Sequence, residues 1–248
     1  MDFERLDEIA RGLMLGRRSH VEREVGHVYY HGVRTMRGVT ELRRRVTADG
    51  SHDELLRAAA LFHDCGKRLE PHERSGALLA GEFLRDALTP GELGEVTRLI
   101  SRHDLRGHAD DDMWVKLLQD ADLIDHYGTM EIWLNIFYNA YHDIPVQDAV
   151  RFYREEYPRQ AQHHRALLNF DAARRIFDEK LAFTLRFVDR LALEGAGGYA
   201  LEQEPAHDCT AKKGLIGRLT PACKWSIIKL QSTLQNMHRG ECSNEPDI

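Results

Sequence analysis

Three short motifs in which Ser or Thr precedes Glu by three residues divide the first hundred residues of the chain. They are SHVE (Ser19–Glu22), SHDE (Ser51–Glu54) and TPGE (Thr89–Glu92). In such a capping box the hydroxyl and the carboxylate bind the free N–H groups at a helix N-terminus. In the third motif Pro90 stands at the first helical position, where its missing N–H costs little. We therefore expect a helix to begin at each motif.

The segments that follow these motifs carry apolar residues at helical spacing. Leu93, Val96, Leu99 and Ile100 are one example. Further segments of this kind cover residues 112–127, 130–142, 146–157 and 170–193. The alternation of apolar and polar residues that is typical of a strand is not convincing anywhere. The pattern predicts an all-α protein, a compact bundle of helices joined by short polar loops.

The composition predicts where the helical domain ends. The chain has 248 residues, of which 42% are hydrophobic, enough to bury a sizeable core. After GAGG, residues 195–198, come scattered Cys, Lys, Gly and Pro residues. We expect a helical domain at residues 1–194 and a C-terminal extension at 195–248 that is loosely docked or partly disordered. A non-native or frame-shifted tail is the alternative.

Charge and hydropathy exclude several classes of function. The net charge of −6 argues against duplex nucleic acid as the main ligand. No apolar run approaches the roughly 20 residues of a membrane span, and the charged start MDFERLDEIARG does not resemble a signal peptide. The four cysteines form no CxxC pair, which argues against a disulfide framework. We expect a soluble, cytoplasmic protein, and the sequence does not predict its oligomeric state.

The stretch AALFHDCGK, residues 59–67, ends an apolar helix with the pair His63 and Asp64. Adjacent helical residues diverge by about 100°, so two neighbouring ligands converge most easily at a helix end. Gly66 permits such a break. His31 precedes the pair on another helix and Asp122 follows it on a later one. The pair either satisfies a helix end or binds a divalent metal, for which imidazole and carboxylate would suit Mn, Fe, Co, Ni, Mg or Zn.

These residues resemble the H…HD…D pattern of the HD-domain metal-dependent phosphohydrolases. AALFHDCGK looks like the AALLHDIGK segment of that family, and QDADLID looks like its DAD-L-D segment. The resemblance covers about residues 20–130, and the helices up to 190 more loosely. Two departures are Cys65, where the family usually has an aliphatic residue, and Gly32, which either lets a substrate approach or has no special role.

The resemblance implies a metal centre with one or two ions. In HDIG-type members two extra histidines look like ligands of a second metal, and PHERSGALLAGEFL and LISRHD place histidines in similar positions. Carried over, the first site comprises His31, His63, Asp64 and Asp122, and the second comprises His72 and His103, with Asp64 bridging. Two metals about 3.5–4 Å apart can activate a water and stabilise the leaving oxygen of a phosphoryl displacement.

Charged residues near the ligands have expected supporting roles. Lys67, Arg34 and Arg102 are expected to contact the substrate phosphate, with Lys67 and Asp64 forming the catalytic pair. Asp120 and Asp125 bracket Asp122 and are expected to accept hydrogen bonds from ligating imidazoles. His27 and Arg106 lie near these ligands in the sequence, and His27 could line the pocket. The expected substrate is a nucleotide or another small phosphate ester.

Two other functions stay open at this point. Some members of the superfamily that have the extra histidines are dinuclear iron oxygenases, and the six candidate ligands of this chain are compatible with that chemistry as well as with hydrolysis. A sensor module that keeps the metal but has lost turnover is the other alternative. Outside the site, the stripe Trp133, Phe137 and Tyr141 is expected to pack in the core, and His163 and His164 are expected to lie on the surface after a loop.

Overall fold

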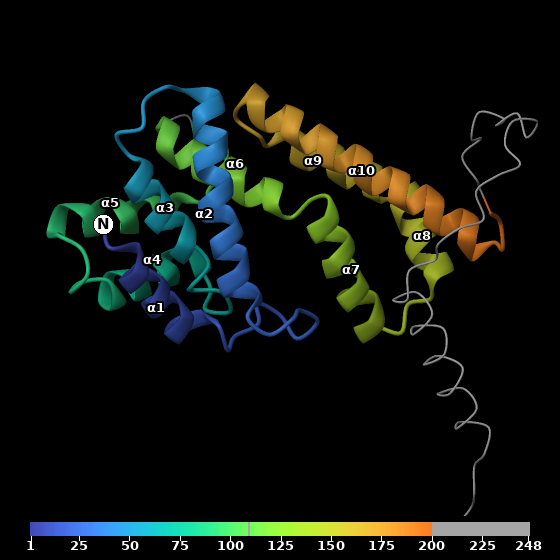
Figure 1. Cartoon of the computed structure of the whole chain (residues 1–248), viewed down its shortest axis with the longest axis horizontal. Coiled ribbons are helices and arrows are strands. Elements are labelled where there is room, and N and C mark those ends of the chain that lie inside the picture. The colour runs from blue at the N-terminus through green and yellow to red at the C-terminus, as the bar shows by residue number, and fades with distance from the viewer. Residues whose placement is uncertain (109, 200–248) are drawn as a thin grey trace, which may run out of the picture. The chain divides into compact units, whose positions relative to one another are not determined.

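The computed structural model describes residues 1–108 and 110–199, and these residues form ten helices and no strand (Figure 1). The helices are α1 (Phe3–Met14), α2 (His27–Val46), α3 (Asp53–Phe62), α4 (His72–Phe83), α5 (Pro90–Arg102), α6 (Met113–Asp125), α7 (Thr129–Tyr141), α8 (Val146–Glu155), α9 (Tyr157–Ala166) and α10 (Asp171–Gly195). The predicted all-α class is confirmed. The expected extension at 195–248 lies almost wholly outside the described residues.

The helix starts agree with the sequence in part. At Thr89 the capping box is formed, because the Thr89 hydroxyl accepts from the Glu92 N–H and the Glu92 carboxylate accepts from the Thr89 N–H. The expected helix start at Ser19–Glu22 is wrong, since that segment forms turns. Helix α2 begins instead after Gly26, whose φ of 81° lets the chain turn sharply into the helix. Helix α3 begins at Asp53 as expected, but without a side-chain cap.

Helix α3 lies at the centre of the first half of the fold. It packs against α2, α5 and α6, and α4 packs against α5. Its residues from Ala58 to Phe62 are all buried, which explains the small and apolar side chains of this segment. At Gly32 the backbone of α2 approaches α3 so closely that a Cβ would lie 2.3 Å from the Leu61 carbonyl oxygen. The structure thus gives Gly32 a packing role rather than a role in substrate approach.

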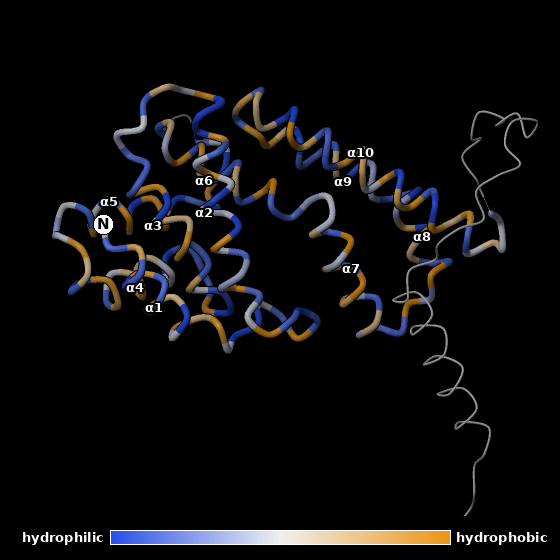
Figure 2. The backbone as a smooth tube through the Cα atoms, in the orientation of Figure 1, coloured by the Kyte–Doolittle hydropathy of each residue, from blue (hydrophilic) through white to orange (hydrophobic). Residues whose placement is uncertain are grey.

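Helices α7 to α10 form the second half, in which apolar and polar residues alternate at helical spacing along α10 (Figure 2). Helix α10 packs against α6, α7 and α8. The expectation that the aromatic stripe of α7 is core is wrong, because Trp133 is 45% exposed and Tyr141 is 56% exposed. The residues of α7 that are buried are Glu131 and Leu134, on a different face of the helix.

The segment before α10 also differs from the sequence-based expectation. Residues 157–166 form helix α9 where a loop was expected. His163 is exposed as expected, but His164 is only partly exposed and its Nδ1 lies 2.6 Å from the Tyr127 hydroxyl. Tyr127 is distant from His164 in the sequence, so the local composition around His164 could not indicate this hydrogen bond.

Within residues 1–108 and 110–199 no helix is long and apolar enough to cross a membrane.

Cys65 is a buried free thiol that donates to the Gly76 carbonyl oxygen, and burial raises its pKa to about 12. It is therefore an inert core thiol and not an available metal ligand. Cys209, Cys223 and Cys242 lie outside the described residues.

Candidate metal centre

The turn after α3 places the histidine–aspartate pair. His63 is the C-cap residue directly after α3, and Asp64 follows it in the turn. A Cβ on Gly66 would lie 2.3 Å from the His72 carbonyl oxygen, so only glycine lets this turn lie against α4. The guanidinium of Arg17 donates to the carbonyl oxygens of Cys65, at 2.7 Å, and of Lys67, at 2.9 Å. The backbone that carries Asp64 is thus held from both sides.

Three buried side chains from different elements meet beside this turn. The Nε2 atom of His31, on α2, lies 3.1 Å from His63 Nε2 and 3.1 Å from an oxygen of Asp122, on α6. His63 Nε2 lies 3.5 Å from the same Asp122 oxygen. Potential ligand atoms of these three residues lie within 4.8 Å of one another, which is close enough for one ion to contact all three. The structure therefore brings together three of the four ligands expected for the first site.

A second group shares His63 with the first. It consists of His63, Asp64 and His103, whose ligand atoms also lie within 4.8 Å of one another. An oxygen of Asp64 is 3.8 Å from His63 Nε2 and 3.6 Å from His103 Nε2. The two groups are continuous, since His31 Nε2 is 3.9 Å from the other Asp64 oxygen.

The three central rings make hydrogen bonds through Nδ1, so that Nε2 of each ring faces the other ligand atoms of the centre. His63 Nδ1 lies 2.8 Å from the Ala60 carbonyl oxygen and His103 Nδ1 lies 2.7 Å from that of Ile100. A carbonyl oxygen only accepts, so Nδ1 carries the proton in each ring and the neutral ring has its lone pair at Nε2. His31 Nδ1 lies 2.7 Å from Asp125 in the same way. This arrangement is typical of metal-binding histidines.

The charges of the centre favour a cation. Asp64 and Asp122 are buried, yet nearby imidazoles keep the pKa of both carboxyl groups well below its usual value, so both are ionised. Burial disfavours a charge on His31, but Asp122 and Asp125 outweigh it and raise the pKa of this ring to about 10. Imidazole nitrogens and carboxylate oxygens are a donor set that suits a borderline or hard divalent ion. The residues present therefore fit the metal that the sequence predicted.

Lys67 and His72 lie at the edge of this centre. The Lys67 Nζ is 3.1 Å from an oxygen of Asp64 and 3.3 Å from His72 Nε2. His72 Nε2 is itself 3.7 Å from that Asp64 oxygen. His72 is thus adjacent to Asp64, as expected for a second site, but it belongs to neither group of convergent ligand atoms and its closest polar contact here is an ammonium.

The two arginines expected at the substrate are engaged by carboxylates. Arg34 makes a bidentate pair with Asp125, the carboxylate that also receives the hydrogen bond of His31. Arg102 pairs with Asp111 through two nitrogens. The geometry favours structural roles for both guanidinium groups, and for Arg34 specifically the role of holding Asp125.

Asp120 and Asp125 were both expected to accept hydrogen bonds from ligating imidazoles, but their side chains lie on different faces of the helix. Asp125 contacts His31 as expected. The carboxylate of Asp120 accepts instead from the backbone N–H groups of Asn169 and Phe170, where α9 joins α10. Two residues apart on a helix means directions about 200° apart, so Asp120 faces away from Asp122. It holds the α10 start against α6 and contacts no ligating imidazole.

Sequence reasoning missed one residue of the centre and left another without a role. His126 Nε2 lies 3.5 Å from Asp122, and its spacing of four residues from Asp122 was the available signal. Arg106 donates to the Gln119 carbonyl oxygen and lies 3.4 Å from Asp122. Its Nη1 is buried and has no hydrogen-bond partner among the described residues. His27, whose ring stacks on that of His31 at 5.9 Å, is buried with an unpartnered Nδ1.

The fold and the centre together are those of an HD domain, because the family model of the HD domain matches residues 28–130. This interval contains His31, His63, Asp64 and Asp122, the H…HD…D pattern itself. Residues 28–130 of the chain are therefore identified as an HD domain. None of the curated proteins is significantly similar to this chain in sequence.

Several solved structures share this fold at low sequence identity. An HD-superfamily hydrolase from Bacillus thuringiensis is 19% identical to this chain with a TM-score of 0.55. The superposition covers 79% of this chain and 99% of the hydrolase. Bacillus subtilis YpgQ in complex with ADP is 18% identical with a TM-score of 0.55, covering 77% of this chain and 95% of YpgQ. A predicted HD superfamily hydrolase from an uncultured Thermotogales bacterium is 22% identical with a TM-score of 0.50, covering 77% of this chain and 92% of the other.

Proposed function

We propose that this chain is a metal-dependent phosphohydrolase that acts on a nucleotide or another small phosphate ester. The observation that carries the proposal is the convergence of the Nε2 atoms of His31, His63 and His103 on the carboxylates of Asp64 and Asp122. A divalent ion bound by these residues would supply Lewis acidity and a nucleophilic water at neutral pH. The similarity of the fold to a structure described as a hydrolase supports hydrolysis, and the ADP complex of the similar YpgQ supports a nucleotide as the substrate.

Two cationic side chains would orient the phosphate. The Lys67 ammonium lies against Asp64 and its side chain is 27% exposed, so it can contact a ligand that enters from solvent. Arg106 has a buried Nη1 without a partner among the described residues, and an N–H of this kind is costly unless it meets an acceptor. A phosphate oxygen beside Asp122 would provide that acceptor. We assign both residues to substrate binding.

The proposal is tested by phosphate release from a panel of nucleotides and small phosphate esters with Mn, Co, Ni, Mg, Zn or Fe. We expect at least one metal and one substrate class to give turnover. His63→Ala should abolish it and reduce metal content, whereas His163→Ala, an exposed residue on α9, should leave both unchanged. Metal analysis accompanies the panel.

Two results would contradict the proposal. Two iron atoms per chain with oxygen uptake, and no phosphate release from any substrate, would show an oxygenase. Tight metal binding with neither phosphate release nor oxygen uptake would show a sensor module. Loss of folding in His63→Ala would be detected by circular dichroism, and Lys67→Met then serves as the second variant, since Lys67 is at the edge of the core.

A further inference from the structure

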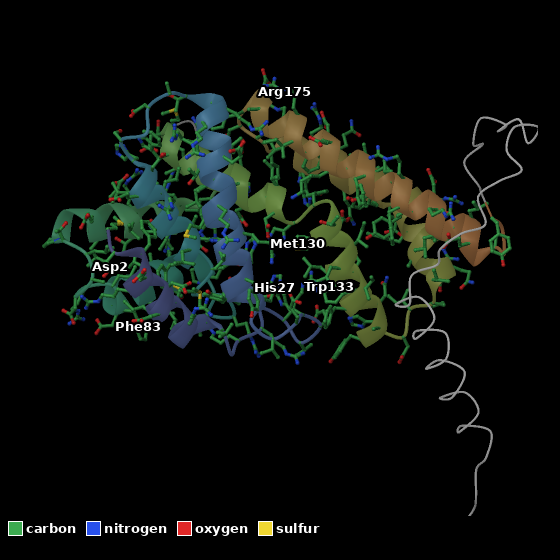
Figure 3. All side chains as sticks on the ribbon, in the orientation of Figure 1. Asp2, His27, Phe83, Met130, Trp133 and Arg175 are labelled. Carbon is green, nitrogen blue, oxygen red and sulfur yellow. The ribbon has the colours of Figure 1, made fainter. Side chains whose placement is uncertain are left out.

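A cavity of about 610 Å³ lies between α7, α8 and the segment before α2. Its wall includes Arg23, Asn135, Tyr138, Asn139, Phe152 and Tyr153. None of the candidate metal ligands lines it. Arg23 closes one side by donating to the Leu134 carbonyl oxygen of α7, and Trp133 donates to Glu24 nearby. In Figure 3 His27, at the start of α2, and Trp133, on α7, flank the interval between these two helices.

The hydroxyl of Tyr153 is the unusual feature of this cavity. Tyr153 is 5% exposed, and its hydroxyl has no hydrogen-bond partner among the described residues. The amide of Asn135 lies near it without reaching hydrogen-bond geometry. A buried hydroxyl usually finds a partner, because leaving it without one costs folding free energy. A ligand in the cavity with a donor or an acceptor at this point would remove the cost.

Two amides on one face of α7 offer further polar contacts. Asn135 and Asn139 are four residues apart, so both side chains lie on the same side of the helix. Asn135 uses its Nδ2 to donate to the Glu131 carbonyl oxygen, which leaves its Oδ1 to accept. The side chain of Asn139 makes no hydrogen bond to any described residue. Asparagine amides match the adjacent donor and acceptor of a base edge.

The rest of the wall is aromatic and carries little net charge. Phe152 and Tyr153 meet edge to face at 5.6 Å, and Tyr138 lines the same cavity. Aromatic rings of this kind stack on nucleobases. Arg23 is offset by Asp148 and Glu156, which also line the cavity. A phosphate group would meet two carboxylates here, whereas a neutral planar ring with polar edges would not be repelled.

We propose that this cavity binds a nucleobase through stacking on its aromatic wall and hydrogen bonds to Asn135, Asn139 and Tyr153. The base is either that of the substrate or that of a separate nucleoside or nucleotide. The inference does not depend on the proposed hydrolysis, since nucleosides without phosphate would bind at the same place.

The test is calorimetric titration of the full chain with adenosine, guanosine, cytidine and uridine, beside ribose. We expect saturable binding of at least one nucleoside and none of ribose. Tyr153→Phe should weaken that binding about fivefold, the loss of one neutral hydrogen bond. It should leave the free energy of unfolding unchanged or higher, because the hydroxyl it removes has no partner.

Tyr157→Phe is the matched control. Its hydroxyl donates to Glu131, and Tyr157 does not line the cavity. This variant should therefore be less stable but bind the nucleoside as the wild type does. Asn139→Leu should weaken binding while keeping the fold, as it removes an amide without a hydrogen bond.

Absence of nucleoside binding up to millimolar concentrations would overturn the inference, and so would binding that neither Tyr153→Phe nor Asn139→Leu weakens. If binding is found, the source of the base follows from kinetics. Competitive inhibition of turnover by the nucleoside supports the substrate's own base, and binding that leaves the substrate KM unchanged supports a separate ligand in the same cavity.

Discussion

The Nε2 atoms of His31 and His63 lie 3.1 Å apart, although one ring comes from α2 and the other from the end of α3. Both rings use Nδ1 elsewhere, at Asp125 and at the Ala60 carbonyl oxygen. When both rings are neutral, two lone pairs therefore face each other. Two facing lone pairs repel each other, and a cation bound beside both nitrogens would remove this repulsion. The carboxylates of Asp122 and Asp125, which raise the pKa of His31 to about 10, favour positive charge at the same place. This relationship is the physical basis for the candidate metal centre.

Asp125 orients His31, so its carboxylate should matter for metal binding without being a ligand. Asp125→Asn is expected to lower metal affinity by about 10- to 100-fold, as is usual when the partner of a ligating histidine is removed. Asp120→Asn is the control, because Asp120 binds the α9–α10 junction. It should lower the free energy of unfolding and leave metal affinity unchanged. Equal metal affinity in Asp125→Asn and the wild type would contradict this role of Asp125.

Arg17 holds the turn that carries Asp64 and Lys67. Its two hydrogen bonds reach the carbonyl oxygens of Cys65 and Lys67. Arg17→Lys keeps the charge but loses the planar two-nitrogen geometry, so we expect turnover to fall about tenfold as Lys67 loses its position. Arg18→Met is the matched control, since within residues 1–108 and 110–199 the Arg18 side chain donates only to the nearby Val21 carbonyl oxygen. Unchanged kcat and KM in Arg17→Lys would show that the turn does not need this contact.

Gly32 is expected to be required for the packing of α2 on α3. A Cβ there would lie 2.3 Å from the Leu61 carbonyl oxygen, and backbone cannot yield easily. Gly32→Ala should lower the free energy of unfolding by about 3 kcal/mol, as for an overpacked core. Gly38→Ala, on the same helix with nothing within 4 Å of its Cβ, should raise it by about 0.5–1 kcal/mol. Urea unfolding measures both, and similar values for the two variants would contradict the packing role.

The local parts of the centre could be predicted from sequence, and the reason is physical. His63 and Asp64 stand at the end of a segment whose apolar residues require burial, so their position at a helix end follows from local pattern. His31 and Asp122 lie on helices that the apolar spacing also indicates. The partners of Arg34 and Arg102 were not predictable in this way, because Asp125 and Asp111 reach them only through tertiary packing.

Two errors concern helix bounds, at residues 19–22 and 157–166, and the others concern which face of a helix is buried. The aromatic residues of α7 suggested a core stripe, but the helix buries Glu131 and Leu134 instead. Asp120 and Asp125 were expected to have the same role, but only Asp125 contacts His31, whereas Asp120 accepts from the Asn169 N–H. Which side of a helix meets its neighbour depends on the whole bundle, so a single sequence indicates it poorly.

Glu131 should make stability depend on pH. Burial raises the pKa of Glu131 to about 8. The unfolded chain releases this proton near its ordinary pKa, so between these two values the unfolded state ionises while the folded state does not. The contribution of Glu131 to the free energy of unfolding is fully present below pH ~4.3. As the pH rises above this value, the contribution decreases by up to about 1.4 kcal/mol per pH unit until the pH passes the pKa of Glu131 in the folded state.

Glu131→Gln removes this dependence. The variant should gain stability relative to the wild type as pH rises from ~5 to ~8, measured by urea unfolding at several pH values. Glu179 is exposed, so Glu179→Gln is the control, and its free energy of unfolding should change with pH as that of the wild type does. If the free energies of unfolding of Glu131→Gln and the wild type differ by the same amount at every pH in this range, the burial of an unionised carboxyl group is contradicted.

The central claim is that His31, His63, Asp64 and Asp122 bind a divalent metal. Anomalous diffraction from crystals grown with Mn²⁺ tests it most directly, because the signal locates the ion without reference to activity. The account predicts a peak in contact with side-chain atoms of these four residues, absent from crystals of His63→Ala. A peak only at other residues, or none in crystals whose metal content is confirmed, would contradict it.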